Sequence, residues 1–254
     1  MVSNVKALGE RLAVQSWCFR TFKENKQVID ALRECGVSHV ELCGKHVDVN
    51  DPRSCERVAQ LYRDAGIGIV AYGAFGFSED EAAGAKAFEF ADMADFPAIT
   101  AMRGDGGLEV ADRLAARYGK RAALHNHGRH DRYGARWELE AALARTSRHV
   151  GVCLDTAWAI DSGFDPVAAA RQFGDRLYGV HIKDFVFDRA GKPEDVIVGQ
   201  GNLDLKALLG TLLEIDFDGY FTLEYEGDVE NPVPSTRKCV EAIRRTLDEI
   251  GEGG

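Results

Sequence analysis

Hydrophobic and polar positions follow two alternating patterns along the chain, and the same two-part unit recurs eight times. A short apolar run rich in β-branched residues ends at a polar residue, and an alanine-rich stretch with apolar residues every three to four positions follows it. The first pattern predicts a buried strand and the second an amphipathic helix. The expected strands are LAVQSW (12–17), HVELCG (39–44), GIVAYG (68–73), AITAM (98–102), AALHNH (122–127), VGVCLDT (150–156), LYGVHIKD (177–184) and YFTLEYEG (220–227). The expected helices are 25–36, 55–66, 81–93, 108–119, 138–147, 165–174, 205–215 and 235–251.

The spacing of these units predicts how they are joined. Markers near the ends of the first and last strands, Gln15 and Glu224, are seven units apart, which gives about 30 residues a step, enough for a strand, a helix and two short loops. Such alternation implies parallel strands, and eight units close a barrel. We therefore predict an α/β fold, a single (β/α)8 TIM barrel over residues 1–254. A doubly wound open sheet is the alternative, disfavoured because no GxGxxG motif follows the first strand.

Local signals refine this prediction. Gly66 follows a helical stretch and is expected to cap its C-terminus. Asp165 followed by Pro166 predicts a helix start, and Ser235 is expected to cap the last helix. The longest step contains FVFDRAGKPEDVIVGQGN, which predicts an enlarged loop at about 185–202 after strand seven, at the mouth of the barrel where function usually resides.

Composition and charge narrow the classes of function. Hydrophobic residues make up 45% and charged residues 28% of the chain, so it can bury a sizeable core. The net charge of −10 disfavours broad electrostatic binding to nucleic acid or to anionic membranes. Without a membrane-length apolar run or a secretory signal, we expect a cytoplasmic protein. The six cysteines form no CxxC motif and are expected to be reduced core thiols.

Ionisable residues stand at the ends of four consecutive expected strands. They are His125, Asp155, His181 and Glu224. In a parallel barrel the carboxyl ends of strands converge on one cavity. Two imidazoles and two carboxylates could then form a site for Mn²⁺, Fe²⁺, Co²⁺ or Zn²⁺. Each residue alone could simply cap a strand end. Burying all four ionisable groups without compensation would be costly, and a bound cation would compensate their charge.

The motifs around these strand ends resemble those of the xylose-isomerase-like TIM barrels, a superfamily that includes sugar phosphate isomerases and epimerases, ketose 3-epimerases, inosose dehydratases and endonuclease IV. The resemblance spans about residues 120–228 and extends into the first half through HVELCG, followed by His46. It implies one divalent metal; we expect manganese, with cobalt, magnesium, zinc and iron as alternatives. The motifs are ALHNHG, CLDTAW with SGFDP, GVHIKD, GQGNLD and DGYFTLEYEG. The implied ligands are His125, Asp155, His181 and Glu224.

One departure from the family pattern concerns strand five. Many epimerases of the family have a glutamate where this chain has His125, and use a pair of glutamates as the two acid/base groups. The HxH arrangement of His125 and His127 is more similar to that of inosose dehydratases and related keto-sugar lyases. A strictly two-glutamate 3-epimerase is therefore disfavoured.

Further residues are candidates for chemistry. Glu41 ends strand two and is expected at the same mouth, as an acid/base group, a hydroxyl acceptor or a solvated carboxylate. His127 lies two residues past His125, on the same side of an extended strand. The candidates for proton transfer are Glu224, Glu41 and His127. The candidates for substrate contact are His46, Lys183, Trp17 and Gln200.

The resemblance and the residues together predict a divalent-metal-dependent sugar isomerase or epimerase. It would act on a ketose or keto-sugar by abstracting a proton alpha to the carbonyl, through a metal-stabilised enediolate. The alternative is an inosose-dehydratase-like dehydratase or keto-glycoside lyase that uses the same enolate. An endonuclease IV-like nuclease and a non-catalytic binding barrel are more remote. The expected partner is a small sugar or polyol-derived substrate, with no nucleic acid and no membrane; the resemblance allows a homo-oligomer.

Overall fold

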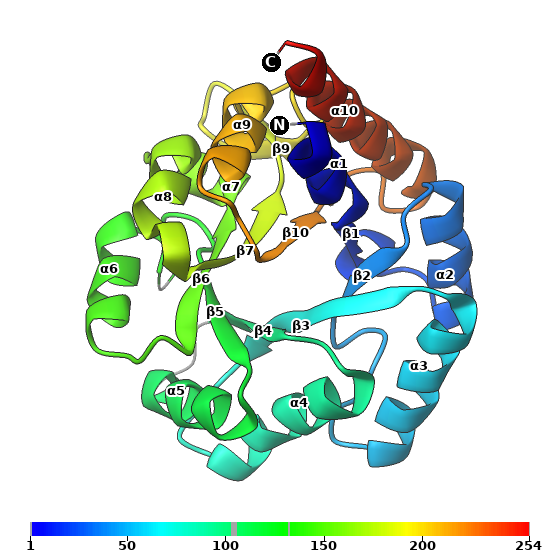
Figure 1. Cartoon of the computed structure of the whole chain (residues 1–254), viewed down its shortest axis with the longest axis vertical. Coiled ribbons are helices and arrows are strands. Elements are labelled where there is room, and N and C mark those ends of the chain that lie inside the picture. Colours follow the sequence, from blue (N-terminus) through cyan, green and yellow to red (C-terminus); the bar gives the residue numbers. More distant parts are fainter. Residues whose placement is uncertain (1, 103–105, 132, 254) are drawn as a thin grey trace.

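The computed structural model describes residues 2–102, 106–131 and 133–253, and its centre is a closed barrel of parallel strands (Figure 1). In this part of the chain eight strands follow one another round the barrel, and the last pairs with the first, Phe221 opposite Leu12. The predicted (β/α)8 TIM barrel is confirmed. The strands are β1 (Leu12–Gln15), β2 (His39–Leu42), β3 (Gly68–Gly76), β4 (Ala98–Met102), β5 (Arg121–His125), β6 (Val150–Asp155), β7 (Leu177–Ile182) and β10 (Tyr220–Leu223).

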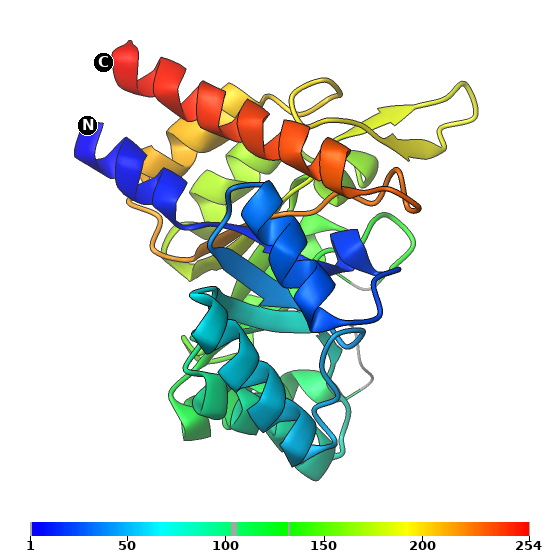
Figure 2. The same cartoon turned by 90° about the vertical axis from the view of Figure 1, so that its right-hand side faces the viewer.

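Helices surround the barrel (Figure 1). They are α1 (Val2–Glu10), α2 (Asn25–Glu34), α3 (Pro52–Ala65), α4 (Glu81–Ala94), α5 (Gly107–Tyr118), α6 (Arg136–Ala144), α7 (Thr156–Asp161), α8 (Pro166–Phe173), α9 (Leu205–Glu214) and α10 (Val233–Glu252). All eight predicted helices are present within a few residues of their expected bounds, and α1 and α7 are additional. Helices α1 and α10, from opposite ends of the chain, pack side by side (Figures 1 and 2).

The interior of the barrel combines small side chains with two large ones. Ala71, Ala98, Ala123 and Cys153 cluster with Tyr178 and Tyr220. Glycines on neighbouring strands let the rings approach: a Cβ atom on Gly179 would lie 2.4 Å from the Tyr220 ring, and one on Gly151 equally close to Tyr178. Because TIM-barrel interiors are filled with side chains, these glycines are packing positions.

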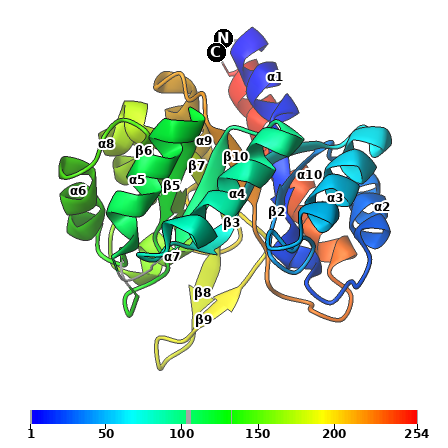
Figure 3. The ribbon, with the colours of Figure 1, turned by 90° about the horizontal axis from the view of Figure 1, so that it is seen from below.

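The predicted enlarged loop contains a short antiparallel hairpin, β8 (Phe185–Phe187) and β9 (Pro193–Asp195). It projects from the barrel on the side away from the two chain termini (Figures 2 and 3). The buried carboxylate of Asp184 organises the segment after the hairpin, because it accepts four backbone hydrogen bonds there. The donors are the N–H groups of Gly199, Gly201, Asn202 and Leu203.

The predicted helix ends are confirmed with one exception. Gly66 follows α3 in the left-handed region, with φ of 70°, and Asp165 accepts a hydrogen bond from the Val167 N–H at the start of α8. The prediction for Ser235 is wrong, because α10 already begins at Val233. Proline is tolerated in a first helical turn, where the backbone N–H has no helical partner. The Ser235 hydroxyl bonds instead to Asp228.

Two expectations from composition concern the cysteines and membranes. All six cysteines are free and buried, as the sequence predicts. None of the helices in the described ranges combines the length and apolar character that a membrane span requires.

Candidate metal centre

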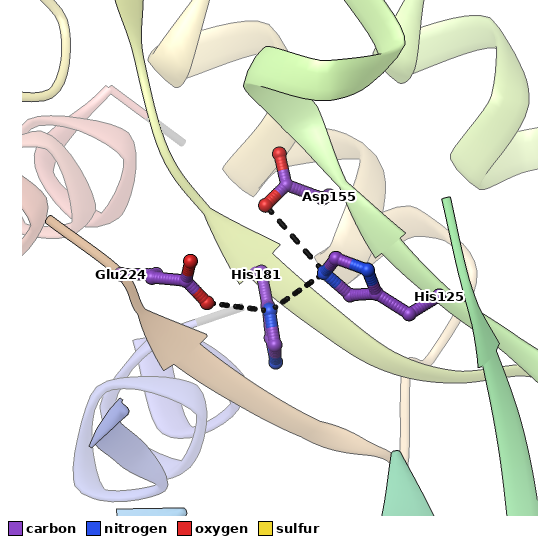
Figure 4. Close-up of side chains that lie close together, drawn as sticks. All are labelled: His125, Asp155, His181 and Glu224. Carbon is purple, nitrogen blue, oxygen red and sulfur yellow. Dashed lines mark hydrogen bonds and ion pairs between the residues drawn. The ribbon is translucent and has the colours of Figure 1, made fainter. Parts of the chain in front are cut away.

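Four neighbouring strands bring the predicted metal ligands together (Figure 4). His125 ends β5, Asp155 ends β6, His181 is the penultimate residue of β7, and Glu224 directly follows β10. Asp155 and His181 are direct partners in the ladder between β6 and β7. Because all the strands are parallel, their carboxyl ends meet at one mouth and direct these side chains to a common point.

The distances between the donor atoms suit one shared ion. His181 Nδ1 lies 3.0 Å from Glu224 Oε2 and 3.1 Å from His125 Nε2, and His125 Nε2 lies 3.7 Å from Asp155 Oδ2. One ligand atom from each residue lies within 4.8 Å of the other three. Bonds of about 2.0–2.2 Å would bring the ligands of a single ion within about 4.4 Å of one another. Small side-chain movements would therefore be enough for all four residues to coordinate one ion.

The hydrogen bonding of Asp155 provides a direct test of fit. Its side chain is fully buried, and Oδ1 accepts a hydrogen bond of 2.9 Å from the Trp158 N–H at the start of α7. The other oxygen, Oδ2, is buried and finds no hydrogen-bond partner among the described residues. An unsatisfied buried acceptor costs about 1–3 kcal/mol, and more when it is charged. A cation bound here would supply the missing partner, so the residues fit a divalent metal.

The surroundings of the donors decide their protonation. Burial opposes the charge on Glu224, but the attraction of Lys183 and His181 outweighs it and lowers the pKa of this carboxyl well below its usual value. Burial also lowers the pKa of His125. Burial acts in the same direction on His181, but its neighbours Cys153, Glu41 and Glu224 outweigh it and raise its pKa well above the usual value. Glu224 and His125 are thus ready to bind a metal near neutral pH, whereas His181 must first lose a proton.

Lys183 holds Glu224 from the side away from the other donors. Its buried ammonium lies 3.1 Å from Glu224 Oε1 and also bonds to Glu226, and Asp195 is 4.0 Å away. This contact occupies Oε1 and leaves Oε2, the oxygen nearest His181, for a metal. Lys183 was predicted as a substrate contact, and the structure places it behind a predicted ligand.

A cavity of about 710 Å³ opens at the candidate centre, and three of the four donors line it. His125, His181 and Glu224 contribute to its floor, and Trp17 and His127 to its wall. The size lies within the range of small-molecule sites. A larger depression of about 960 Å³ lies beside α1 and α10. Among the described residues, the only group of histidine and acidic side chains arranged to hold a metal is the one at the 710 Å³ cavity.

The other predicted site residues divide between the cavity and its surroundings. The Trp17 Nε1–H donates to Glu226 Oε2 at 2.8 Å, and the His127 side chain is 40% exposed, its ring 4.8 Å from that of Trp158. Besides Lys183 and the ligand Asp155, three predicted residues do not line the cavity: Glu41 and His46 are buried, and Gln200 is exposed.

Several residues of the site were not singled out from the sequence. Glu226 lines the cavity, and it alternates with Glu224 in LEYE, a signal for two side chains on one side of an extended segment. Asp195 comes from the hairpin, where no pattern distinguishes it. Thr100 contacts both Glu41 and Tyr220 only because the barrel brings β4, β2 and β10 together.

Sequence comparisons identify related proteins. The family model described as Xylose isomerase-like TIM barrel matches residues 106–246. An inosose dehydratase from Geobacillus kaustophilus is 25% identical over 161 residues, which cover 57% of this chain and 52% of that protein. The rhizopine catabolism protein MocC from Rhizobium meliloti is 27% identical over 146 residues, 50% of this chain and 43% of that protein. The chain thus matches about half the length of these curated relatives.

Solved structures share the fold at low sequence identity. The IOLI protein, whose crystal structure contains a zinc atom, has a TM-score of 0.73 and 18% identity and covers 95% of this chain and 98% of its own. The 3-keto-D-glucoside 4-epimerase YcjR from E. coli has a TM-score of 0.74 and 18% identity, and the match covers 92% of this chain and 99% of that protein. At these identities the likeness establishes the barrel alone.

Proposed function

Because this chain belongs to the xylose isomerase-like TIM-barrel family, we propose that it is a divalent-metal-dependent sugar isomerase or epimerase. It would abstract a proton from the carbon next to the carbonyl of a ketose or keto-sugar and return the proton at a different position or face. The observation that carries this proposal is the set of four buried donors beneath an open cavity. Manganese is the proposed metal. Zinc is the alternative, because the similar IOLI structure contains a zinc atom.

The chain's own residues suit proton transfer at a carbon. A divalent ion held by the four donors would supply positive charge beside the carbonyl oxygen, where negative charge develops as the proton leaves. The lowered pKa of Glu224 keeps its carboxylate ionised, and Glu224 lines the cavity, so it is the proposed proton acceptor. His127 lines the same cavity and is the proposed group that returns the proton. Trp17 and Glu226 are fixed to each other at the wall and would orient substrate hydroxyls.

The charges around the cavity favour a neutral substrate. The two ligand carboxylates would balance a divalent ion, and the Lys183 ammonium is already surrounded by carboxylates. Of the described lining residues, Lys45 supplies the one further cation, and it lies exposed at the mouth. A small sugar or polyol-derived ketone matches this balance better than a phosphorylated substrate does.

Dehydration is the second candidate, and a specific observation favours it. His125 stands at the end of β5, so a two-glutamate pair with Glu224 is absent there, and Glu41 does not line the cavity. Inosose dehydratases are among the curated relatives. In this reaction the same proton abstraction would be followed by loss of a β-hydroxyl as water.

Solvent exchange tests the step that both candidates share. Metal-loaded protein is incubated in D₂O with a panel of neutral ketoses, keto-sugars and inososes, and deuterium next to the carbonyl is followed by NMR. Exchange without loss of water supports isomerisation or epimerisation, whereas a product that has lost water identifies the dehydratase. Metal-loaded protein that exchanges no deuterium into any of them would contradict the proposed activity.

A matched pair of variants tests the role of His127. His127→Asn is expected to slow exchange by about 10²–10⁴-fold, the usual contribution of a general acid or base. His130→Asn is the control, because His130 lies exposed three residues further along the same loop and does not line the cavity. Equal rates for the two variants would remove His127 from the proposed mechanism.

A further inference from the structure

Glu41 lies inside the barrel, behind a predicted metal ligand. Its carboxylate is fully buried and does not line the cavity. One oxygen, Oε2, lies 2.8 Å from His181 Nε2, on the side of the imidazole away from the other donors. The second oxygen, Oε1, accepts a hydrogen bond of 2.5 Å from the Thr100 hydroxyl. Both oxygens are therefore engaged inside the barrel, and His181 stands between Glu41 and the mouth.

The direction of each hydrogen bond in this cluster follows from the groups present. An ionised carboxylate only accepts, so His181 Nε2 and the Thr100 hydroxyl must both donate to Glu41. The single hydroxyl hydrogen of Thr100 is then used. Tyr220, whose hydroxyl lies 2.6 Å from that of Thr100, must therefore be the donor between the two. A directed chain runs from Tyr220 through Thr100 to Glu41, where it meets the His181 N–H.

This chain decides which nitrogen of His181 faces the metal site. With the Nε2 hydrogen held by Glu41, the neutral imidazole carries its lone pair on Nδ1. Nδ1 is the nitrogen that lies 3.0 Å from Glu224 Oε2 and 3.1 Å from His125 Nε2. A ligating imidazole needs this second hydrogen bond to fix its tautomer and its ring orientation.

We infer that Glu41 is a positioning residue that fixes His181 for metal binding through Nδ1, and that Thr100 and Tyr220 hold Glu41 in turn. The inference rests on the proposed function, since it concerns the same metal centre, and it replaces the direct proton-transfer role predicted for Glu41 from the sequence. A carboxylate enclosed behind His181 has no contact with a substrate in the cavity.

Glu41→Gln is the sharpest test, because it keeps the shape of the side chain and removes its charge. With Tyr220 donating to Thr100 as in the wild type, the Thr100 hydrogen remains directed at residue 41. The glutamine would therefore turn its carbonyl oxygen to Thr100 and its NH₂ group to His181 Nε2. His181 would then carry its hydrogen on Nδ1, where it blocks the metal. We expect zinc affinity to fall by about 10–100-fold.

Two threonine variants form a matched pair that does not alter Glu41. Thr100→Val removes one hydrogen bond to Glu41 and is expected to weaken zinc binding by roughly tenfold, the lower end of that range. Thr222→Val is the control, because the buried Thr222 hydroxyl has no hydrogen-bond partner among the described residues. Its zinc affinity should equal that of the wild type. This pair keeps the inference testable if Glu41→Gln does not fold.

Zinc affinity is measured by competition with a chelator, and the imidazole by ¹⁵N NMR of zinc-loaded protein. The wild type should show a hydrogen on Nε2 of His181 and zinc on Nδ1. Wild-type protein that binds zinc through His181 Nε2, or variants at Glu41 and Thr100 that match Thr222→Val, would overturn the inference and leave the proposed function intact. Wild-type protein that takes up no zinc, manganese or cobalt would instead overturn the proposed function, and the inference with it.

Discussion

Lys183 is a buried cation whose neighbours are carboxylates instead of water. Burial opposes its charge, but Glu224, Asp155 and Glu226 outweigh burial and raise the pKa of Lys183 above its usual value. The ammonium also lies 5.5 Å from the centres of the Trp158 and Phe185 rings. The positive charge of Lys183 therefore compensates the carboxylates on its own side of Glu224, whereas a metal would bind on the other side.

Removing that charge should destabilise the protein strongly. Lys183→Met leaves buried carboxylates without compensation, and we expect the free energy of unfolding to fall by about 3–5 kcal/mol. Urea unfolding of the metal-free proteins measures this change. Lys192→Met, at an exposed position in the hairpin, is the matched control and should change stability by no more than about 0.5 kcal/mol. Similar stabilities for the two variants would show that the Lys183 contacts are unimportant for folding.

The raised pKa of His181 predicts how metal binding depends on pH. The metal-free protein keeps His181 protonated above the ordinary value of 6.5, and a metal must displace the Nδ1 proton. Protonated His181 stabilises the metal-free fold below its unfolded pKa, and this contribution is lost as pH rises through its folded pKa. The increase in melting temperature on adding metal should therefore grow with pH above about 6.5. An increase that stays the same as pH rises would show that His181 is neutral in the metal-free protein.

At the scale of single residues, the sequence predicts donors better than it predicts their roles. His125, Asp155 and His181 could be assigned because each stands at or beside a strand end, and such ends converge in a barrel. Glu41 also lies near a strand end, but the pattern does not show that its carboxylate turns inward to His181. That contact depends on Thr100 and Tyr220, which come from strands more than a hundred residues apart along the chain.

Strands β7 and β10 owe their close packing to glycine. Gly179→Ala places a Cβ atom 2.4 Å from the Tyr220 ring, and overpacking of this kind costs about 1–3 kcal/mol. Gly210→Ala is the matched control, because a Cβ atom there meets no atom within 4 Å and alanine favours the interior of α9. It should stabilise the protein by roughly 0.5–1 kcal/mol. Thermal unfolding measures both changes, and equal melting temperatures would contradict this view of the interior.

At the scale of elements, the predictions fail where contacts override local pattern. The hairpin strands β8 and β9 are three residues long, too short for an alternating pattern to identify them. Buried Asp184 orders the chain after them, and a single aspartate in a loop gives no sign of four backbone contacts. Helix α10 begins two residues before the predicted Ser235 because its first turn includes proline.

For the whole molecule, the repeated unit was sufficient to predict the barrel. Eight strand–helix units of similar length leave few ways to bury every strand on both faces, and closure through β1 and β10 is the one observed. Helix α1 lies outside this repeat, so the repeat could not predict it. The candidate metal centre is a property of the same closure, since its donors come from four different units.

Metal content is the measurement that tests the proposed centre most directly. Purified protein is loaded with manganese, cobalt or zinc, dialysed and analysed for metal per chain, alongside Asp155→Ala and His181→Ala, with circular dichroism to confirm folding. We predict one ion per wild-type chain and loss of that ion in both folded variants. Wild-type protein that retains no ion after loading, or variants that retain it fully, would contradict a metal centre at the mouth of this barrel.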